Sequence, residues 1–427
     1  MPAEYLERSI EPVLRRAARE FPAVVLTGPR QSGKTTLLRR AFGKTHRYVS
    51  LEPPDVRRSA NTDPRGFLAA YPPPVILDEV QHAPDLLAFL KEAIDEYRSA
   101  RGRFLVTGSQ NLTLSERVRE SLAGRAAVLR LLPMSDREAL RVPGMLLPWD
   151  PGRPSPSRSR SESASGARVS SRPEGVVARG PRRWHLWADL LRGGYPELVA
   201  EPRRDVAMWH SSYVQTYLER DVRGLRQVGD LTQFQGFLRA LAARSGQLLN
   251  LSDLSRDLGV AVNTAKAWLS VLEATYQIVV LRPYFANIGK RLVKTPKVYF
   301  TDVGTLCYLV GLRDPEHAAS GPMGGAIFET AVLAEIVKAL VHRGEEPLVH
   351  FWRTSGGDEV DIVVEAGARL VPVEVKLSST PRPEMANGIA RLRDALGARV
   401  TDGYVVHGGD VRLPLAPGVT AIPFREL

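Results

Sequence analysis

Short apolar runs alternate with helical periods in the N-terminal part of the chain. Three runs, at residues 23–27, 74–78 and 103–107, have the length and composition of buried strands. Between the last two, the apolar residues Leu86, Leu87, Leu90 and Ile94 follow a helical period. Strands that alternate with helices along a chain are typical of a parallel sheet covered by helices. The pattern therefore predicts an α/β fold for this part.

The middle of the chain carries a different pattern, in which helices come before strands. Helical periods cover residues 234–244, 253–257 and 263–274, and Gly259 is expected to form the turn before the last of them. Two strands are expected at the end of this region, at residues 276–282 and 297–301. This order predicts a winged helix-turn-helix over residues 233–312.

The C-terminal part combines a helix, a strand and a hairpin. Residues 326–340 are apolar at a helical period, residues 348–352 have the pattern of a strand, and two further strands are expected at 359–365 and 369–376. If Ala366 and Gly367 form a two-residue loop, the alternation of side chains places three polar residues on one face of the hairpin. They are Asp361, Glu374 and Lys376. A loop of odd length would separate them.

Composition changes this picture at residues 151–183. This segment consists mainly of Ser, Arg, Pro and Gly, so it cannot bury enough apolar surface to fold, and we expect it to be disordered. It holds eight Arg and two acids, which gives 8 − 2 = +6 of the total net charge of +11. An excess of positive charge favours an anionic partner. With 44% hydrophobic and 25% charged residues, the whole chain is neither a collagen nor a coiled coil nor fully disordered.

Other features bear on where the protein acts. No apolar run approaches the roughly 18 residues that span a bilayer, and residues 1–10 lack the pattern of a signal peptide. Cys307 is the single cysteine, so no disulfide forms within the chain. We therefore expect a cytoplasmic protein without a membrane partner.

The strongest chemical signature directly follows the first strand. Gly28-Pro-Arg-Gln-Ser-Gly-Lys-Thr35 matches the phosphate-binding loop G-x-x-x-x-G-K-[ST], and a helix has to begin here so that its positive end faces the anion. Lys34 would reach the β- and γ-phosphates, and Thr35 would bind Mg²⁺. The residues expected to bind the nucleotide are Gly28, Pro29, Arg30, Gln31, Ser32, Gly33, Lys34, Thr35, Thr36, Asp78 and Gln110.

Further polar residues at the ends of the strands would complete this site. Asp78 and Glu79 follow the second strand, at the edge where parallel sheets bind ligands. Asp78 would hold the Mg²⁺, and Glu79 would polarise the attacking water. Gln110 would sense the γ-phosphate, although its neighbour Ser109 equally suits a helix N-cap. Arg125 would neutralise charge on the transferred phosphoryl group, in its own subunit or in a neighbouring one.

A basic cluster lies between the two strands of the predicted wing. Its members are Lys290, Arg291, Lys294 and Lys297. A basic wing beside a recognition helix suits contacts with the phosphates of nucleic acid, to which the insert at 151–183 would add. The predicted recognition helix has Lys266 as its single cation, so a plain packing module is the alternative.

Together these motifs resemble the AAA-like ATPases of bacteria and archaea. The matching segments are Leu26–Leu37, Leu77–Gln81, Thr107–Gln110, Ser121–Arg125, Gly193–Pro196 and Tyr217–Asp221. The resemblance implies that the protein binds and hydrolyses ATP with Mg²⁺. It also implies a C-terminal domain that is similar to PD-(D/E)XK nucleases.

The expected organisation of the chain therefore has five parts. They are an AAA-like P-loop ATPase domain with a parallel sheet at residues 1–145, the basic insert at 151–183, a helical connector at 184–232, the winged helix at 233–312 and a nuclease-like α/β domain at 326–427.

In the last domain, Asp361 and Glu374-Val-Lys376 match the D…(D/E)-x-K arrangement of the nucleases that it resembles. Two carboxylates would hold Mg²⁺, and the lysine would orient or deprotonate the water. Glu329 would be the acid that such nucleases often place on a helix. The candidate catalytic residues of the whole chain are thus Lys34, Glu79, Arg125, Glu329, Asp361, Glu374 and Lys376.

Two functions agree with these motifs. The first is a Mg²⁺-dependent ATPase coupled to a nuclease-like domain that acts on nucleic acid. The second is an ATP-switched regulator that binds DNA or a protein, with the C-terminal domain as a non-catalytic docking module. Either function is compatible with an oligomer, and the motifs leave the substrate and the physiological process open.

Overall fold

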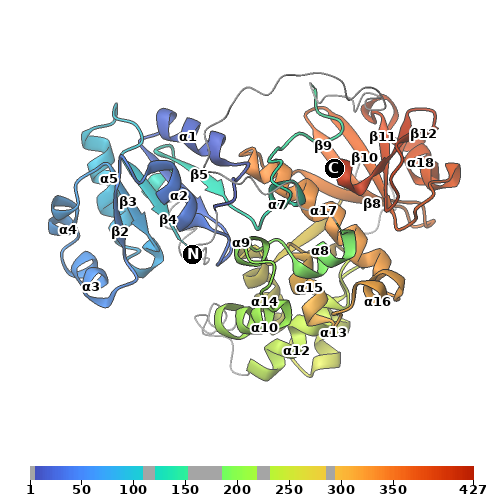
Figure 1. Ribbon diagram of the computed structural model, residues 1–427, viewed down its shortest axis with the longest axis horizontal. Coiled ribbons are helices and arrows are strands. Elements are labelled where there is room, and N and C mark those ends of the chain that lie inside the picture. Colours follow the sequence, from blue (N-terminus) through green and yellow to red (C-terminus); the bar gives the residue numbers. More distant parts are fainter. Residues whose placement is uncertain (1–4, 109–120, 152–184, 219–230, 285–293) are drawn as a thin grey trace, which may run out of the picture.

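The computed structural model describes residues 5–108, 121–151, 185–218, 231–284 and 294–427, shown as ribbons in Figure 1. The N-terminal domain is built on a five-stranded parallel sheet of order β2-β3-β4-β1-β5. Its strands are β1 (Ala23–Thr27), β2 (Arg47–Ser50), β3 (Val75–Asp78), β4 (Phe104–Thr107) and β5 (Ala126–Arg130). The parallel α/β sheet expected from the sequence is thus confirmed, and β1, β3 and β4 begin and end within one residue of the expected runs.

Helices cover both faces of this sheet because its strands are apolar on both sides. In β1, Val24 and Leu26 belong to the core with α1 (Glu11–Glu20) and α2 (Lys34–Phe42), whereas Val25 belongs to the core on the opposite face. That second core is completed by α3 (Pro54–Thr62), α4 (Pro64–Ala70) and α5 (Leu86–Glu96). Two short helical turns complete the domain, η1 (Val80–His82) and α7 (Asp136–Ala139).

A helical region follows. Its elements are α8 (Leu186–Arg192), α9 (Pro196–Ala200), α10 (Val206–Tyr213), the π-helix η2 (Val214–Leu218), α12 (Leu231–Ala242), α13 (Leu251–Leu258), α14 (Val262–Ala274), α15 (Val303–Leu309) and α16 (Pro315–Ser320). After α14 the chain forms an antiparallel hairpin of β6 (Ile278–Pro283) and β7 (Lys297–Phe300). The winged helix expected over residues 233–312 stays a prediction.

The hairpin does not stand apart as a wing, because β6 also pairs in parallel with β8 of the C-terminal part. Both belong to an eight-stranded mixed sheet of order β12-β13-β11-β10-β9-β8-β6-β7. The remaining strands are β8 (Val349–Arg353), β9 (Glu359–Ala366), β10 (Arg369–Lys376), β11 (Gly403–His407), β12 (Leu413–Ala416) and β13 (Val419–Pro423). The middle and C-terminal segments therefore share one sheet, and one hydrophobic core extends over both.

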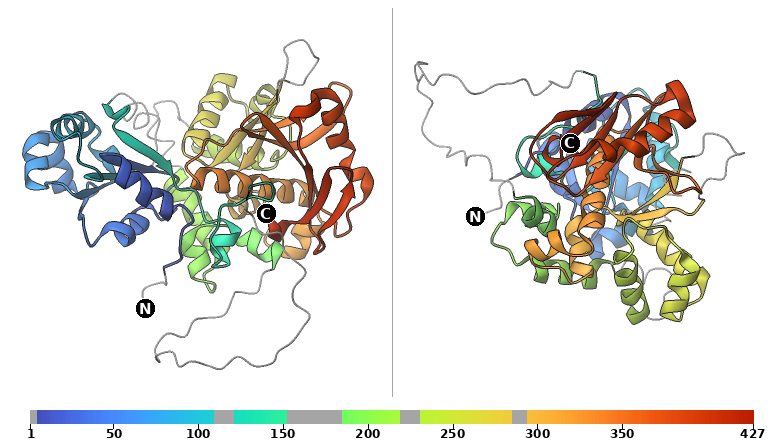
Figure 2. Two further views of the ribbon diagram at one scale, coloured as in Figure 1. Left: turned by 90° about the horizontal axis from the view of Figure 1, so that it is seen from above. Right: turned by 90° about the vertical axis from the view of Figure 1, so that its right-hand side faces the viewer.

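Two helices pack on opposite faces of this second sheet. The long helix α17 (Gly324–His342) shares a core with Ile362 and Val373, whereas α18 (Asn387–Leu396) packs against Val363 and Val405. Short turns complete the domain, η3 (Pro383–Ala386), η4 (Gly397–Arg399) and η5 (Phe424–Glu426). Figures 1 and 2 show the two sheets at opposite ends of the long axis, with α17 reaching toward β5, which it contacts.

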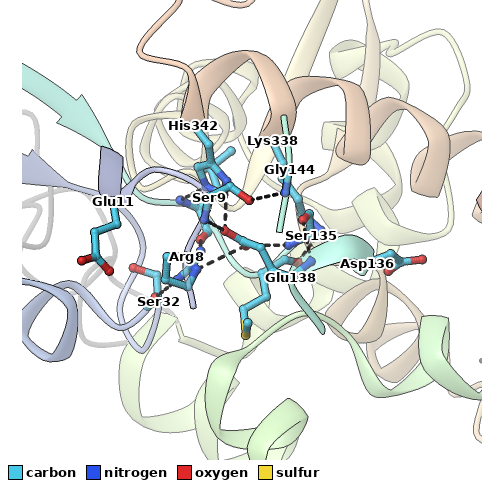
Figure 3. A network of polar contacts seen from close by, with 12 residues as sticks. Arg8, Ser9, Glu11, Ser32, Ser135, Asp136, Glu138, Gly144, Lys338 and His342 are labelled. Carbon is cyan, nitrogen blue, oxygen red and sulfur yellow. Dashed lines mark hydrogen bonds and ion pairs between the residues drawn. The ribbon is translucent and has the colours of Figure 1, made fainter. Parts of the chain in front are cut away.

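The two units meet at residues 131–138, which we call the junction segment. Arg8, which is 5% exposed, donates hydrogen bonds to the carbonyls of Ser32 in the phosphate-binding loop and of Leu132 in the junction segment, both at 2.7 Å. Its Nε lies 3.2 Å from Oε2 of Glu138, and Figure 3 shows this ion pair at the centre of a buried polar network. One arginine thus connects the phosphate-binding loop to the junction segment.

Helix α17 holds the same segment from the other side. Lys338 donates to the carbonyl of Met134 at 3.0 Å and forms an ion pair with Glu335 at 2.8 Å. Glu335 in turn accepts a hydrogen bond from the backbone N–H of Asp136 at 2.9 Å. The junction segment is therefore fixed to the C-terminal unit through side chains of a single helix.

Burial and neighbouring charges shift the pKa values of Glu138 and His342 in this network, and these shifts make stability depend on pH in acid. Burial alone would raise the pKa of Glu138, but Arg8 and two backbone N–H donors lower it to about 2. Burial lowers the pKa of His342 to about 4 against the attraction of Glu138. Since the N–H of Leu132 donates to Nε2 of His342 at 3.3 Å, this nitrogen acts as an acceptor and the ring is neutral.

We expect His342 to make the protein sensitive to acid. Because its pKa falls from 6.5 to about 4 on folding, the unfolded chain binds a proton over this range that the folded chain excludes. Stability should therefore decrease as the pH falls from 6.5 to 4, by up to about 3 kcal/mol. Thermal melting of wild type and His342→Gln at pH 7 and pH 4.5 measures this, and the variant should lose less stability in acid. The exposed His317→Gln is the matched control, and an acid response equal to wild type in His342→Gln would contradict the assignment.

Candidate functional site

The backbone of the phosphate-binding loop adopts positive φ angles at several positions. Gln31 and Gly33 have positive φ angles of 62° and 91°, and Gly28 has a φ of 144°. A side chain at Gly28 would collide with the carbonyl oxygen of Leu131, where the loop passes the junction segment. Helix α2 then begins at Lys34, as the motif predicts, so its N-terminal N–H groups face the loop.

Lys34 is held inside this loop. Its side chain is buried, and Nζ donates to the carbonyls of Gly28 at 3.0 Å and of Pro29 at 2.8 Å. These charge-assisted contacts with backbone carbonyls hold the ammonium within the loop. Its contact with the β- and γ-phosphates stays a prediction.

Asp78 is the centre of a second polar cluster, beside the loop. Its carboxylate accepts hydrogen bonds from Oγ1 of Thr35 at 2.9 and 3.0 Å, from the hydroxyl of Tyr48 at 2.7 Å and from Oγ1 of Thr107. Burial and the neighbouring Asp78 raise the pKa of Tyr48 to about 12. The structure thus brings together Thr35 and Asp78, the two predicted Mg²⁺ ligands, and adds Tyr48 and Thr107, which the sequence analysis did not assign to the site.

Glu79 has a strained backbone at the end of β3. Its φ of 58° lies in the left-handed region, which non-glycine residues adopt at a cost and mostly where the surroundings enforce it. The backbone N–H of Glu79 donates a hydrogen bond to Oγ1 of Thr107 at 3.2 Å, and the side chain of Gln81 donates to the Glu79 carboxylate. The carboxylate is thereby positioned next to the Asp78 cluster.

A cavity of about 530 Å³ opens above the loop. It is lined from the N-terminal segment, the loop, the end of β3 and α9, with side chains that include Tyr5, Arg8, Lys34, Glu52, Glu79 and Pro196. Since α9 belongs to residues 184–232, the expected connector takes part in the site. Arg8 and Glu52 are polar lining residues that the sequence analysis missed, because neither lies in a recognised motif.

Arg125, a further predicted residue, lies away from this cavity. Arg125 forms an ion pair with Asp95, with nitrogen–oxygen distances of 2.7 and 2.9 Å, and it does not line the cavity. Its expected role in neutralising charge on the phosphoryl group stays a prediction. Gln110 lies outside the described residues.

The C-terminal hairpin brings its three predicted residues together. The register pairs Val373 with Ile362 and Arg369 with Ala366, so the loop is Gly367-Ala368 rather than Ala366-Gly367. The loop keeps an even length, which confirms that Asp361, Glu374 and Lys376 share one face. Nζ of Lys376 lies 2.6 Å from Oε1 of Glu374 and 3.8 Å from Oδ2 of Asp361.

The carboxylates of this cluster have an increased affinity for a proton or a cation. Burial, together with the charge of Asp361, raises the pKa of Glu374 to about 8 and that of Glu329 to about 7. The pKa of Asp361 is also raised by burial. Burial would lower the pKa of Lys376, but the neighbouring Asp361 and Glu374 raise it. Crowding of buried carboxylates in this way is common in functional sites and raises the affinity for a proton or a cation.

The same cluster contains Lys297, which corrects one expectation from the sequence. Lys297 was expected in a basic wing, but it is 4% exposed and its Nζ lies 3.2 Å from Glu329 and 2.7 Å from Glu359. Its place in the wing is therefore wrong, because strand β7 carries it into the core of the sheet. Of the other residues predicted for the basic wing, Lys294 is exposed, and Lys290 and Arg291 lie outside the described residues.

The expected insert at 151–183 lies, after residue 151, outside the described residues. Within the residues that are described, no group of three or more His, Cys, Asp or Glu side chains is arranged to hold a metal ion. Any divalent cation at the C-terminal cluster would therefore depend on two carboxylates. In the same part of the chain, no helix combines the length and hydrophobicity that crossing a bilayer requires.

Comparison with known families gives three successive matches along the chain. Residues 20–140 match the family model described as AAA domain. Two further models, both described as domains of unknown function, match residues 183–316 (DUF8612) and residues 324–427 (DUF4143). The N-terminal domain is thus an AAA-type P-loop domain.

Relatives match along nearly the whole chain. The uncharacterized protein Rv2008c of Mycobacterium tuberculosis is 34% identical over 421 residues, which cover 97% of this chain and 82% of that protein. The uncharacterized protein Mb2031c of Mycobacterium bovis has the same identity and coverage. Among solved structures, the Walker-type ATPase PABY2304 of Pyrococcus abyssi covers 71% of this chain and 96% of its own, with 16% identity and a TM-score of 0.43.

Lys34→Ala should weaken nucleotide binding by about 10- to 100-fold, because it removes charge-assisted contacts to phosphate worth about 1.5–3 kcal/mol. Equilibrium binding of a fluorescent ATP analogue measures the change. Lys44→Ala, at an exposed position just after α2, is the matched control and should bind as wild type does. Wild-type affinity in Lys34→Ala, with an unchanged melting temperature, would remove the loop from the nucleotide site.

Proposed function

This chain belongs to the family of the mycobacterial proteins Rv2008c and Mb2031c, and from this membership and the geometry above we propose that it is a Mg²⁺-dependent ATPase coupled to a nuclease-like domain that acts on nucleic acid. The single observation that carries the ATPase part is that Lys34, Thr35 and Glu79 line one cavity, with the Asp78 carboxylate bonded to Thr35 beside it. In this arrangement, groups that bind phosphate, hold a cation and accept a proton lie next to each other.

Each residue of the nucleotide site has one task in this proposal. Lys34 and the N–H groups at the start of α2 bind the β- and γ-phosphates. Thr35 and Asp78 are the residues that would hold Mg²⁺, which supplies charge neutralisation on the phosphates when it is bound. The hydroxyl of Tyr48 keeps the Asp78 carboxylate oriented. Glu79 orients the attacking water and accepts its proton.

Arg125 takes part only from a neighbouring subunit in this proposal. Its ion pair with Asp95 lies at the surface, where the side chain of Arg125 is 21% exposed. An arginine supplied in this way by a neighbour stabilises charge in the transition state. An oligomer would therefore be the form that hydrolyses ATP fastest.

The C-terminal cluster fits a divalent cation in two respects. Oε2 of Glu374 is buried without a hydrogen-bond partner among the described residues. A side chain at Gly388 would lie 3.5 Å from this oxygen and would collide with the carbonyl of Glu359, so the glycine keeps the space beside Glu374 open. Asp361 and Glu374 would hold the cation, which would supply Lewis acidity to a phosphodiester, and the ammonium of Lys376 would orient the water.

Nucleic acid is the proposed substrate because the net charge of +11 favours a polyanion. The exposed Lys294, together with Lys290, Arg291 and the 151–183 insert, would bind its phosphates. The second candidate is an ATP-switched regulator with a non-catalytic docking domain. It is favoured by one observation, that no three metal-ligating side chains converge within the described part of the chain.

Glu79→Gln should keep ATP binding but lower the rate of hydrolysis by about 100-fold or more, because an amide does not accept the proton from water. Phosphate release under multiple turnover, together with ATP-analogue affinity, measures both effects. Glu52→Gln provides the comparison, since Glu52 lines the same cavity. If Glu52→Gln rather than Glu79→Gln stops hydrolysis, the general base has been assigned to the wrong carboxylate.

Asp361→Asn and Glu374→Gln should each abolish metal-dependent cleavage of DNA or RNA while ATP hydrolysis continues, because the two sites lie in different domains. Gel analysis of labelled nucleic acid with Mg²⁺ or Mn²⁺ and ATP measures cleavage. Asp358→Asn, at an exposed position near β9, is the matched control and should cut as wild type does. A wild-type protein that hydrolyses ATP but cuts neither DNA nor RNA would favour the docking-module alternative.

A further inference from the structure

Lys297 occupies a position that is unusual for an ammonium group. It is 4% exposed, and its Nζ lies 2.7 Å from Oε1 of Glu359 and 3.2 Å from Oε1 of Glu329. The same oxygen of Glu329 accepts a hydrogen bond from the hydroxyl of Tyr299 at 2.5 Å. On its other side, Glu359 is 3.1 Å from Arg353. Both carboxylates are therefore engaged by groups of the protein itself.

The neighbouring half of the cluster is less fully engaged. Lys376 lies close to Glu374 at 2.6 Å but at 3.8 Å from Asp361, and its side chain is 38% exposed, so it can move aside into solvent. Glu374 is only 7% exposed, and its Oε2 is buried without a hydrogen-bond partner among the described residues. A buried carboxylate oxygen without a partner is costly, and a cation would relieve this cost.

We propose that Lys297 is a built-in cation that occupies Glu329 and Glu359 and thereby limits the cluster to one divalent ion, held by Asp361 and Glu374. The proposal rests on the metal site of the proposed function and deepens it. A second divalent ion on Glu329 would compete with an ammonium that already contacts the same oxygen, and the two like charges would repel each other strongly at that distance. Lys297 is thus a positioning residue for Glu329, and Glu329 is not a metal ligand.

This proposal departs from the role that the resemblance to nucleases implies for Glu329. In that role the helix-borne acid joins the catalytic set directly, whereas here it is the partner of Lys297 and Tyr299. A merely structural ion pair would also explain the contacts of Lys297. The two explanations differ in the number of ions that the cluster binds once the ammonium is removed, which is a quantity that can be measured without any activity.

The experiment counts Mn²⁺ ions bound to the full-length protein without nucleotide, by electron paramagnetic resonance of free Mn²⁺. The number at the cluster is the difference between a given protein and one common reference, the wild-type sequence carrying Asp361→Asn and Glu374→Gln, so that ions bound elsewhere cancel. These isosteric changes remove buried charge and should preserve the fold. We expect one ion in wild type and two in Lys297→Met. Lys297→Arg, which keeps the cation, should bind one.

A double variant identifies where the additional ion binds. The double variant Lys297→Met, Glu329→Gln should return to one ion, because Glu329 is released by the first change and removed by the second. Melting temperatures give an independent readout, since Lys297→Met leaves two carboxylates without their ammonium. Mn²⁺ should therefore raise the melting temperature of Lys297→Met by more than it raises that of wild type.

Several outcomes would overturn the proposal, and they can be told apart. Two ions in wild type would refute the role of Lys297 but leave the proposed metal-dependent function standing. No ion in wild type would refute both. One ion in a folded Lys297→Met would identify Lys297 as a structural residue only. If Lys297→Met does not fold, Glu329→Gln decides, because it keeps Lys297 and should still bind one ion, whereas loss of that ion would identify Glu329 as a ligand.

Discussion

The buried ion pair of Arg8 and Glu138 is the interaction on which the arrangement of the two units depends. Arg8 holds the phosphate-binding loop through Ser32 and the junction segment through Leu132, so its guanidinium satisfies groups that come from distant parts of the chain. Removing either charge would leave the other buried without its opposite charge, which typically costs several kcal/mol. The pair therefore specifies one way of joining the nucleotide site to the rest of the protein.

Helix α17 extends this connection to the second site. Its C-terminal half holds the junction segment through Glu335, Lys338 and His342, and its N-terminal half carries Glu329 into the acidic cluster. Glu329 and His342 are 13 positions apart on one helix, about 20 Å along its axis. A helix that is packed along its length behaves as a rigid element, so the phosphate-binding loop and the acidic cluster are held in a fixed geometry by the same element.

Lys297 shows that the role of a charged side chain depends on whether it is buried. In the sequence it is one of four basic residues close together, which is the pattern of a surface that binds phosphates. In the structure it is the central cation of a set of buried carboxylates, because β7 continues the C-terminal sheet instead of projecting as a wing. Hydrophobic pattern and local charge do not reveal this difference, since it depends on β6 pairing with β8, which lies far along the chain.

The sequence by itself determined the features that depend on local order. Alternating strands and helices defined the parallel sheet, and the glycines and Lys34 defined the phosphate-binding loop. The alternation of side chains placed Asp361, Glu374 and Lys376 on one face only for an even loop, and the register of the folded hairpin decided that parity. Only the tertiary structure decided which distant residues join them, as Tyr48 joins Asp78, Arg8 joins the loop and Lys297 joins Glu329. The physical reason is that periodicity and turn chemistry act between neighbours in the chain, whereas a buried charge finds its partner through the packing of whole elements.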